Sequence, residues 1–248
     1  MSANNWIVPD WPAPPGVRAL ITTRAGGVSG GAYAGMNLGM CTGDAVEDVA
    51  RNRALLRQSL PAEPLWLRQM HGTRVAEPDR TDGSREADAA VARRPGSVCA
   101  VLTADCLPLL MCDEEGSVVA AVHAGWRGLS SGVIEQALRV MDRPRAALLA
   151  YLGPAIGPAA YEVGAEVRAA FIAADRGGDP EAEAAFAPGK PGKFYADLYA
   201  LARQRLARSG VVRVYGGGYC TYTERERFFS YRRDGATGRM ASLIWMEA

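Results

Sequence analysis

The chain has 248 residues, of which 48% are hydrophobic and 22% charged, a composition typical of globular proteins. Its 28 basic and 27 acidic side chains leave a net charge of +1, which favours neither a nucleic acid nor a membrane as partner. No secretory signal is recognisable, and the longest apolar stretch, Val98 to Cys112, is too short and too interrupted to span a bilayer. Five scattered cysteines without a CxxC pair indicate free thiols, so we expect a cytoplasmic protein.

The first third of the chain alternates an apolar run with a helical pattern. Residues 18–24 are expected to form a strand that enters a glycine-rich loop. Asp44 is expected to cap a helix over residues 45–60, where apolar side chains recur at helical spacing. A second strand is expected over residues 64–72, ending near His71.

The middle of the chain contains two nearly continuous apolar runs, residues 97–106 and 117–125, with turn residues at 113–117. Because neither run alternates with polar residues, we expect strands that are covered on both faces. A helix is predicted over residues 130–141, followed by a strand within residues 146–157 that leaves into a Gly/Pro loop.

Helices are predicted next, over residues 164–174 and 194–209, the second ended by Gly210. Residues 175–193 between them are rich in glycine, proline and charge and are expected to be a surface loop. The final strands are expected within residues 211–222 and 241–248. This order of elements predicts a single α+β domain, residues 1–248, with a mixed sheet.

The chain has only two histidines, and each lies where an expected strand passes into a loop. His71 is in RQMHGTRV, His123 ends VVAAVHAG, and Cys106 lies between them in LTADCLP. Strand ends that share one edge of a sheet bring distant residues together. Imidazole and thiolate are zinc ligands, and three such ligands leave one tetrahedral position open, as in catalytic zinc sites.

The separations of these residues, 35 from 71 to 106 and 17 from 106 to 123, form no recognised ligand motif. Two other interpretations therefore stay open at this point. The histidines can be hydrogen-bonded structural residues, with Cys106 a buried thiol. Alternatively, Cys106 can act as a nucleophile with one histidine as its base, as in cysteine hydrolases.

Seven blocks occur in order along the chain: TRAGGVSGGAYAGMNLG, VARNR, QMHGTRV, TADCLPLLM, AVHAGWRGLSSGV, LGPAIGPAAYEVG and CTYTERERFFSYRRDGATGRMASLIW. Together they resemble the YfiH-like laccase-domain family, whose members are also called multicopper polyphenol oxidases or peptidoglycan-editing factors. The resemblance covers essentially the whole chain. It implies a layered α+β fold, with mixed sheets flanked by helices, that is distantly similar to bacterial toxin cysteine deamidases, and it implies that His71, Cys106 and His123 hold a metal ion.

The resemblance implies several activities. Some members are described as purine nucleoside enzymes that cleave adenosine, inosine and methylthioadenosine with phosphate and also deaminate adenosine. A cell-wall precursor amidase role is attached to other relatives, and some are called laccases. A multicopper oxidase cluster needs about ten histidines, and this chain has 2, so only a single copper beside Met70 or Met111 is conceivable.

Phosphorolysis requires an anion site, which glycine-rich turns and arginine side chains can supply. The segment RAGGVSGG offers Arg24 and Ser29, and HAGWRGLSS offers Arg127, so these three are the expected phosphate ligands. Each arginine could equally form a surface salt bridge.

Deamination requires a water activated at a metal and a carboxylate that moves protons. Asp105 and Asp88 are expected near the metal as catalytic residues together with Cys106, and Glu162 is a further candidate. The aromatic residues available to contact a purine lie near the C-terminus: Tyr219, Phe228, Phe229 and Tyr231.

The sequence thus predicts a zinc-dependent purine nucleoside phosphorylase with adenosine deaminase activity, with a nucleoside and phosphate as partners. Copper is the alternative metal. A hydrolase of cell-wall precursor amides is the alternative function, and polyphenol oxidation the least favoured. Preferred nucleoside and oligomeric state stay open.

Overall fold

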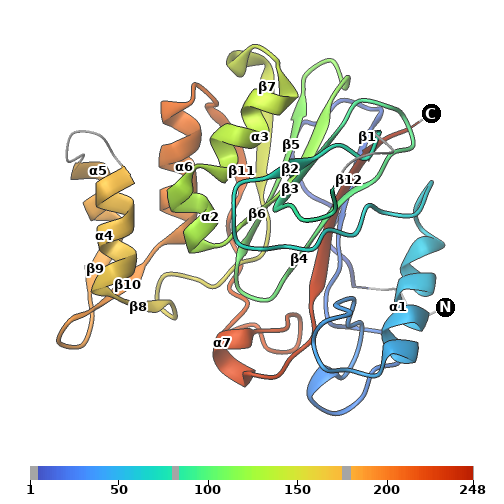
Figure 1. Cartoon of the computed structure of the whole chain (residues 1–248), viewed down its shortest axis with the longest axis horizontal. Coiled ribbons are helices and arrows are strands. Elements are labelled where there is room, and N and C mark those ends of the chain that lie inside the picture. The colour runs from blue at the N-terminus through green and yellow to red at the C-terminus, as the bar shows by residue number, and fades with distance from the viewer. Residues whose placement is uncertain (1–4, 80–83, 175–179, 248) are drawn as a thin grey trace.

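The computed structural model describes residues 5–79, 84–174 and 180–247, which fold into stacked layers (Figure 1). A six-stranded mixed sheet packs on one face against helices and on the other against a three-stranded antiparallel sheet. A helix from the N-terminal part of the chain covers the outer face of the smaller sheet. The predicted α+β class with layered mixed sheets is confirmed.

The six-stranded sheet has the order β11-β7-β5-β6-β3-β2. Its strands are β2 (Val75–Ala76), β3 (Ala89–Ala92), β5 (Leu107–Asp113), β6 (Val119–Ala124), β7 (Leu148–Leu152) and β11 (Arg213–Gly216). Pairing is antiparallel from β7 through β5 and β6 to β3, and parallel for β11 with β7 and for β2 with β3. Every residue of β5 and β6 is buried, as the continuous apolar run at residues 117–125 predicts for β6.

The three-stranded sheet has the order β1-β12-β4. Its strands are β1 (Val17–Ile21), β4 (Cys99–Thr103) and β12 (Met240–Met246). Side chains of β12 alternate between the two faces of the sheet, because successive residues of a strand point to opposite sides. Ile244 packs between the sheets, whereas Leu243 and Trp245 pack toward α1 (Val46–Arg57).

Helices α3 (Val133–Met141) and α6 (Leu198–Arg208) pack against the six-stranded sheet, beside α2 (Trp126–Ser131). A lobe at the left of Figure 1 holds α4, α5 and a small sheet of order β8-β10-β9. The remaining elements are α4 (Ala165–Ala174), α5 (Pro180–Ala184), α7 (Tyr231–Asp234), β8 (Glu162–Gly164), β9 (Phe186–Pro188), β10 (Lys193–Ala196) and 3-10 turns Gly31–Tyr33 and Arg145–Ala147. Among the described residues, no helix is both long and apolar enough to cross a bilayer.

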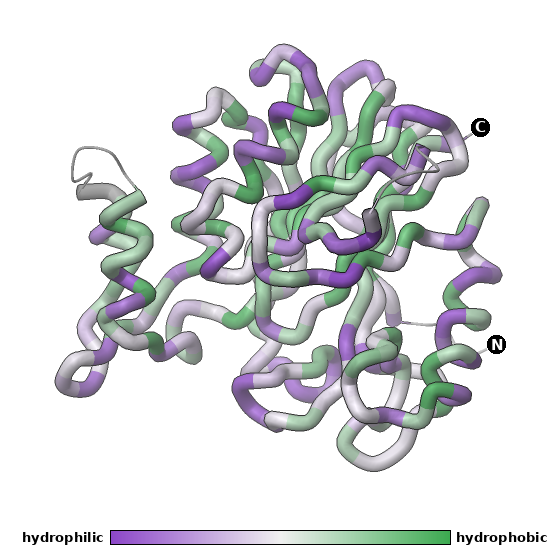
Figure 2. Tube along the Cα trace, in the orientation of Figure 1, coloured by the Kyte–Doolittle hydropathy of each residue, from purple (hydrophilic) through white to green (hydrophobic). Residues whose placement is uncertain are grey.

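Hydrophobic residues concentrate along the central strands, and the loops and outer helix faces are more hydrophilic (Figure 2). Leu109 and Met111 of β5 face the helices, while Leu110 and Cys112 face the second sheet. Each fully buried leucine or methionine side chain of this kind contributes about 1.5–3 kcal/mol to folding. All five cysteines are free thiols, as predicted.

Two strand expectations are wrong. Residues 64–72 form no strand: within this segment only Leu65 and Arg68 make isolated bridges. In addition, the sequence pattern does not separate β5 from β4, because one apolar run covers both strands. The chain passes from the smaller sheet to the larger one at residues 104–106, without any turn that composition would reveal.

Helix boundaries also differ from expectation. The helix predicted over 130–141 begins earlier, at Trp126, and is interrupted at Gly132, whose φ of +95° is left-handed. The helix predicted over 194–209 begins only after Asp197, whose carboxylate accepts from the backbone N–H of Ala200. The preceding residues belong to β10 instead.

Asp44 does not cap α1: the residue at the cap is Ala45, and no side chain bonds there. The Asp44 carboxylate instead accepts hydrogen bonds from Ser29 Oγ and Asn37 Nδ2. The segment 175–193, expected to be a surface loop, contains α5 and β9 in its described part, and residues 175–179 lie outside the described residues.

Candidate metal centre

Three side chains that are distant in sequence meet at one edge of the six-stranded sheet: His71, Cys106 and His123, here called the metal centre. Their ligand atoms all lie within 4.8 Å of one another. Cys106 Sγ lies 3.9 Å from His71 Nε2, and the two imidazole rings meet edge to face with centroids 4.8 Å apart. The structure thus brings together the three residues that the sequence singled out, and their binding of a metal stays a prediction.

The fold explains how Cys106 and His123 come together. Cys106 lies directly before β5, on the passage between the two sheets, and His123 is the penultimate residue of β6. Leu107 of β5 is paired with Ala124 of β6, so the next pair along the ladder is Cys106 with Gly125. His123 is only 3% exposed, Cys106 is partly exposed and His71 is exposed, so the centre opens to the surface on the His71 side.

Gly125 provides the space that the three ligands occupy. A Cβ atom at this position would lie 3.0 Å from His71 Cδ2, 3.1 Å from Cys106 Sγ and 3.7 Å from His123 Cε1. Gly128 is constrained in the same way, because its Cβ would lie 2.8 Å from the carbonyl oxygen of Gly72 in the His71 turn. The glycines of the HAGWRG block therefore let the turn that carries His71 approach the start of α2. The two imidazoles and the thiolate are ligand types that fit a borderline metal such as zinc.

Asp88 holds the metal centre from behind. It directly precedes β3, beside His123, and is 1% exposed. Its Oδ1 accepts from His123 Nδ1 at 2.8 Å and from the backbone N–H of His71 at 2.9 Å. Its Oδ2 accepts from the N–H groups of Gly72 at 2.7 Å and Met70 at 3.2 Å. Such a bond fixes the histidine tautomer and presents Nε2 to the ligand side.

These hydrogen bonds also set the protonation state of Asp88. Burial alone would raise its pKa, but the bonds from His123, Gly72 and Met70 outweigh burial and hold the pKa below its ordinary value. The ionised Asp88 accepts four hydrogen bonds, which hold the His71 turn and the His123 ring in place. Its expected role in moving protons stays a prediction.

Cys106 and His123 influence each other electrostatically. Burial would raise the pKa of the Cys106 thiol, but the neighbouring His123 and His71 imidazoles lower it to about 6. Burial would likewise lower the pKa of His123, but Cys106 and Asp88 raise it to about 9. The thiol therefore ionises readily near neutral pH, as a metal ligand or a nucleophile must.

Asp105, the residue before the ligand cysteine, faces the C-terminal segment. Its Oδ1 accepts from Thr221 Oγ1 and its Oδ2 from the backbone N–H of Arg232, both at 2.6 Å. Its φ of +96° lies in the region that favours glycine, and His71 has a φ of +59°. Two left-handed residues at one site are a sign of a functional constraint on the backbone. Asp105 thus lies next to the centre, as expected, and ties it to α7.

Three further side chains near the centre were not identified from the sequence: Tyr161, Arg232 and Arg239. The Arg232 guanidinium lies 5.1 Å from the centroid of the Tyr161 ring. Burial raises the pKa of Tyr161, and charges on Cys106, Arg232, Asp105 and Arg127 also act on it. Burial lowers the pKa of Arg239, while charges on Cys106 and Asp105 raise it in part.

The residues expected to bind phosphate occupy different surroundings. Arg127 is exposed directly beside the ligand turn, with its guanidinium over the ring of Trp126. Arg24 lies over Phe229 and donates to the carbonyl of Arg225. No contact among the described residues joins Arg24 to the metal centre.

Ser29 belongs to a structural network below the first loop. Its Oγ donates to Asp44 and accepts from Asn52 Nδ2 at 2.9 Å, so the hydroxyl hydrogen is already used.

Two of the candidate purine contacts lie away from any surface: Phe228 and Phe229 are completely buried in the core and cannot face a ligand.

Comparisons with known proteins identify the family of the chain. The family profile described as "Multi-copper polyphenol oxidoreductase laccase" matches residues 18–247. The chain is 51% identical over 245 residues to purine nucleoside phosphorylase PA4543 of Pseudomonas aeruginosa, covering 98% of this chain and 99% of that one. It is 52% identical over 243 residues to purine nucleoside phosphorylase YfiH of Escherichia coli, covering 97% and 98%.

Solved structures give the same assignment. Protein NMB0706 of Neisseria meningitidis superposes with a TM-score of 0.93 at 52% identity, over 98% of this chain and 100% of that one. YlmD of Geobacillus stearothermophilus superposes with a TM-score of 0.90 at 29% identity, over 100% and 98%. The chain therefore belongs to the YfiH-like laccase-domain family.

Proposed function

We propose that this chain is a purine nucleoside phosphorylase that works at the metal centre. The observation that carries the proposal is an open His2Cys ligand group bordered by arginines without carboxylate partners. Arg127, Arg232 and Arg239 form no ion pair with any carboxylate among the described residues; they lie over aromatic rings or donate to carbonyls. Unpaired guanidinium groups at an ionisable centre suit an anionic substrate, and close relatives carry the name purine nucleoside phosphorylase.

Phosphorolysis transfers the ribose from the base to phosphate. A phosphate oxygen forms a bond to C1′ while the bond from C1′ to the base nitrogen breaks, and the base leaves with the electron pair and takes up a proton. In this proposal the arginine side chains bind and orient the phosphate. Asp88 keeps His123 in one tautomer, so the ligand atoms stay aligned throughout the reaction.

Zinc is the proposed metal, because catalytic zinc sites use imidazole and thiolate ligands. In such sites three protein ligands leave the fourth coordination position open. When bound, such an ion supplies Lewis-acid stabilisation to negative charge that develops on the substrate. Copper fits the same donors, but the chain's 2 histidines hold at most this one centre and not a multicopper cluster.

The test uses inosine with and without phosphate, and the full-length metal-loaded protein. We expect ribose 1-phosphate and hypoxanthine only when phosphate is present. Cys106→Ala should remove both the bound metal and the turnover, whereas the matched variant Cys41→Ala, at an exposed cysteine, should keep both. Turnover that persists in Cys106→Ala would rule out the metal centre as the catalyst.

Deamination of adenosine is the finer part of the proposal. The two carboxylates closest in sequence or contact to the ligands, Asp88 and Asp105, are already engaged in hydrogen bonds. We therefore expect deamination to be slower than phosphorolysis, measured as inosine formed from adenosine without phosphate. The proposed partners are a nucleoside and phosphate, and the free thiols support the cytoplasm as the proposed compartment.

One observation favours a second function, hydrolysis of an amide by the Cys106 thiolate. In a cysteine hydrolase a carboxylate orients a histidine, which acts as the base for a nucleophilic cysteine. Asp88, His123 and Cys106 could fill these three roles, and the Asp88–His123 hydrogen bond measures 2.8 Å. A cell-wall precursor peptide is the substrate to test. Amide cleavage that survives removal of metal by a chelator and stops on alkylation of Cys106 would favour this function over phosphorolysis.

A further inference from the structure

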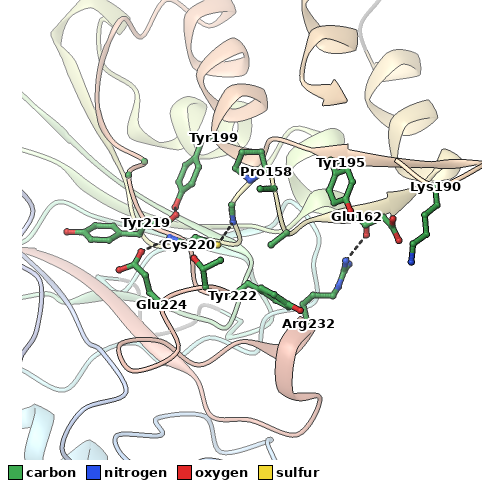
Figure 3. A pocket seen from close by; sticks show the side chains of 16 residues that line it. Pro158, Glu162, Lys190, Tyr195, Tyr199, Tyr219, Cys220, Tyr222, Glu224 and Arg232 are labelled. Carbon is green, nitrogen blue, oxygen red and sulfur yellow. Dashed lines mark hydrogen bonds between the residues drawn. The ribbon is translucent and has the colours of Figure 1, made fainter. Parts of the chain in front are cut away.

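A cavity of about 750 Å³ lies beyond Arg232, on the side of α7 that faces the β8-β10-β9 lobe (Figure 3). Its walls come from three segments, residues 157–162, 190–199 and 217–224, together with Arg232. This volume is in the range of small-molecule sites. None of the three metal ligands lines it.

Several side chains of the cavity wall are already used by the fold. The Tyr199 hydroxyl accepts from the N–H of Ala155 at 2.8 Å and lies within hydrogen-bond distance of two carbonyls. Cys220 Sγ accepts from the N–H of Gly157 at 3.2 Å. Glu224 accepts from the N–H of Cys220 and pairs with Arg227. These hydrogen bonds hold the three side chains in the wall of the cavity.

Glu162 is different, because one of its carboxylate oxygens is buried without a partner. Its Oε1 has no hydrogen-bond donor among the described residues. Glu162 begins β8 and is paired with Tyr195 across the small sheet, so the fold holds its position. A buried acceptor that lacks a donor costs folding free energy and needs an explanation. A ligand that brings hydroxyl or N–H donors supplies one.

The neighbours of Glu162 narrow the chemistry of that ligand. Lys190 and Arg232 line the same cavity, so a cationic ligand would be repelled. Next to its own carboxylate, Glu162 would repel an anionic group of a ligand. A neutral molecule with hydroxyl donors fits both conditions, and Tyr195 and Tyr222 add aromatic surface for a flat ring (Figure 3). A ribonucleoside has these features: two adjacent hydroxyls and a planar base.

Arg232 connects the cavity to the metal centre. Its side chain lines the cavity, and its NH1 donates to the carbonyl oxygen of Glu162 at 2.6 Å. Its backbone N–H donates at 2.6 Å to Asp105, the residue before ligand Cys106. A ribose held at Glu162 would therefore stand on one side of Arg232, with the metal centre on the other.

We propose that this cavity is the ribonucleoside subsite and that Glu162 recognises the ribose hydroxyls. The inference rests on the proposed phosphorylase function and adds the residue that determines sugar specificity. A carboxylate that accepts from ribose hydroxyls discriminates against deoxyribose, because the missing hydroxyl leaves the carboxylate without a donor again.

The experiment compares inosine, 2′-deoxyinosine and 3′-deoxyinosine with the metal-loaded full chain. For the unmodified protein we expect KM for inosine about 10-fold below KM for at least one of the deoxy analogues, the size of one charge-assisted hydrogen bond. Glu162→Ala should raise KM for inosine about 10-fold and remove the difference between the nucleosides, with kcat and metal content nearly unchanged. Its melting temperature should not fall, since no protein donor is lost. The matched control Glu166→Gln, an exposed carboxylate four residues away, should retain the discrimination.

The outcomes separate the two proposals. If the unmodified protein cleaves inosine with phosphate but Glu162→Ala discriminates ribose from deoxyribose as before, the subsite assignment is wrong and the phosphorylase function stands. If Glu162→Ala melts at a lower temperature and keeps its KM, Glu162 has a structural role only, which also overturns the assignment. If no nucleoside is cleaved by the unmodified protein, the phosphorylase proposal fails, and this inference fails with it.

Discussion

The metal centre and the cavity wall beyond Arg232 are built in opposite ways. At the metal centre the supporting carboxylate, Asp88, accepts four hydrogen bonds and is almost completely buried. At the cavity wall Glu162 has a buried oxygen with no donor at all among the described residues. A fully satisfied carboxylate fixes the geometry of its neighbours, whereas an unsatisfied one retains bonding capacity for a ligand. The comparison separates Asp88, whose hydrogen bonds hold the metal-ligand residues in place, from Glu162, which is proposed to recognise the substrate.

The largest expected effect comes from filling the space between the ligands. Gly125→Ala places a Cβ 3.0–3.1 Å from His71 Cδ2 and Cys106 Sγ, so the ligands must move apart. We expect metal affinity to fall at least about 100-fold, beyond the range of changes to supporting residues, while circular dichroism stays native. The matched control is Gly72→Ala, where the nearest atom, Asp88 Oδ2, would be 3.6 Å away and metal binding should persist. Unchanged metal stoichiometry in Gly125→Ala would contradict this account.

A smaller effect is expected when the satisfied carboxylate loses its charge. Asp88→Asn keeps the shape but presents an amide N–H to donors, and metal affinity should fall about 10–100-fold. Stability should fall by about 1–3 kcal/mol, since a buried donor is left unpaired. Metal titration and denaturant unfolding measure the two effects.

The pH dependence of the free energy of unfolding tests whether Asp88 is ionised in the folded state. Because the folded pKa of Asp88 is depressed, its contribution to stability is present above the unfolded pKa, about 4, and is lost as pH falls through the folded value. The stability difference between the unmodified protein and Asp88→Asn should therefore narrow in acid. A difference that stays constant down to pH 2 would argue that Asp88 is not ionised in the folded state.

The smallest effects distinguish two of the three expected anion contacts, Ser29 and Arg127. Ser29→Ala should lower stability by about 1 kcal/mol, because Asp44 and Asn52 lose a shared hydroxyl, and should leave KM for phosphate within about 2-fold. Arg127→Gln should do the reverse: raise KM for phosphate about 10-fold with little change in stability, since its guanidinium is exposed. If Ser29→Ala changes KM for phosphate more than Arg127→Gln does, the assignment of the anion site is wrong.

Sequence patterns identified the metal centre better than the surrounding site. His71, Cys106 and His123 are scarce residue types at the ends of apolar runs, and the resemblance to a known family named all three. β5 was not separated from β4, because the run from Val98 to Cys112 stays apolar while the chain changes sheets. That change depends on the packing of two layers, which has no local signal in composition or periodicity.

The residues around the centre depend on long-range packing for the same reason. Arg232 reaches Asp105 across 127 residues of sequence, and the sequence predicts Glu162 only as a candidate proton carrier. The sequence alone does not distinguish such a guanidinium or carboxylate from a surface charge. Similarly, Asp44 satisfies the cap preference but meets Ser29 and Asn37 first, so a tertiary contact overrides a local one.

The passage of the chain between the two sheets at residues 104–106 has a consequence for the sulfur ligand. Cys106 is attached to the smaller sheet through β4 and to the larger one through β5, whereas His123 belongs to the larger sheet alone. The distance between thiolate and imidazole therefore reports how closely the layers are stacked. Loosening of the interior between the sheets, by heat or by a cavity far from any ligand, should release the ion before the helices unfold.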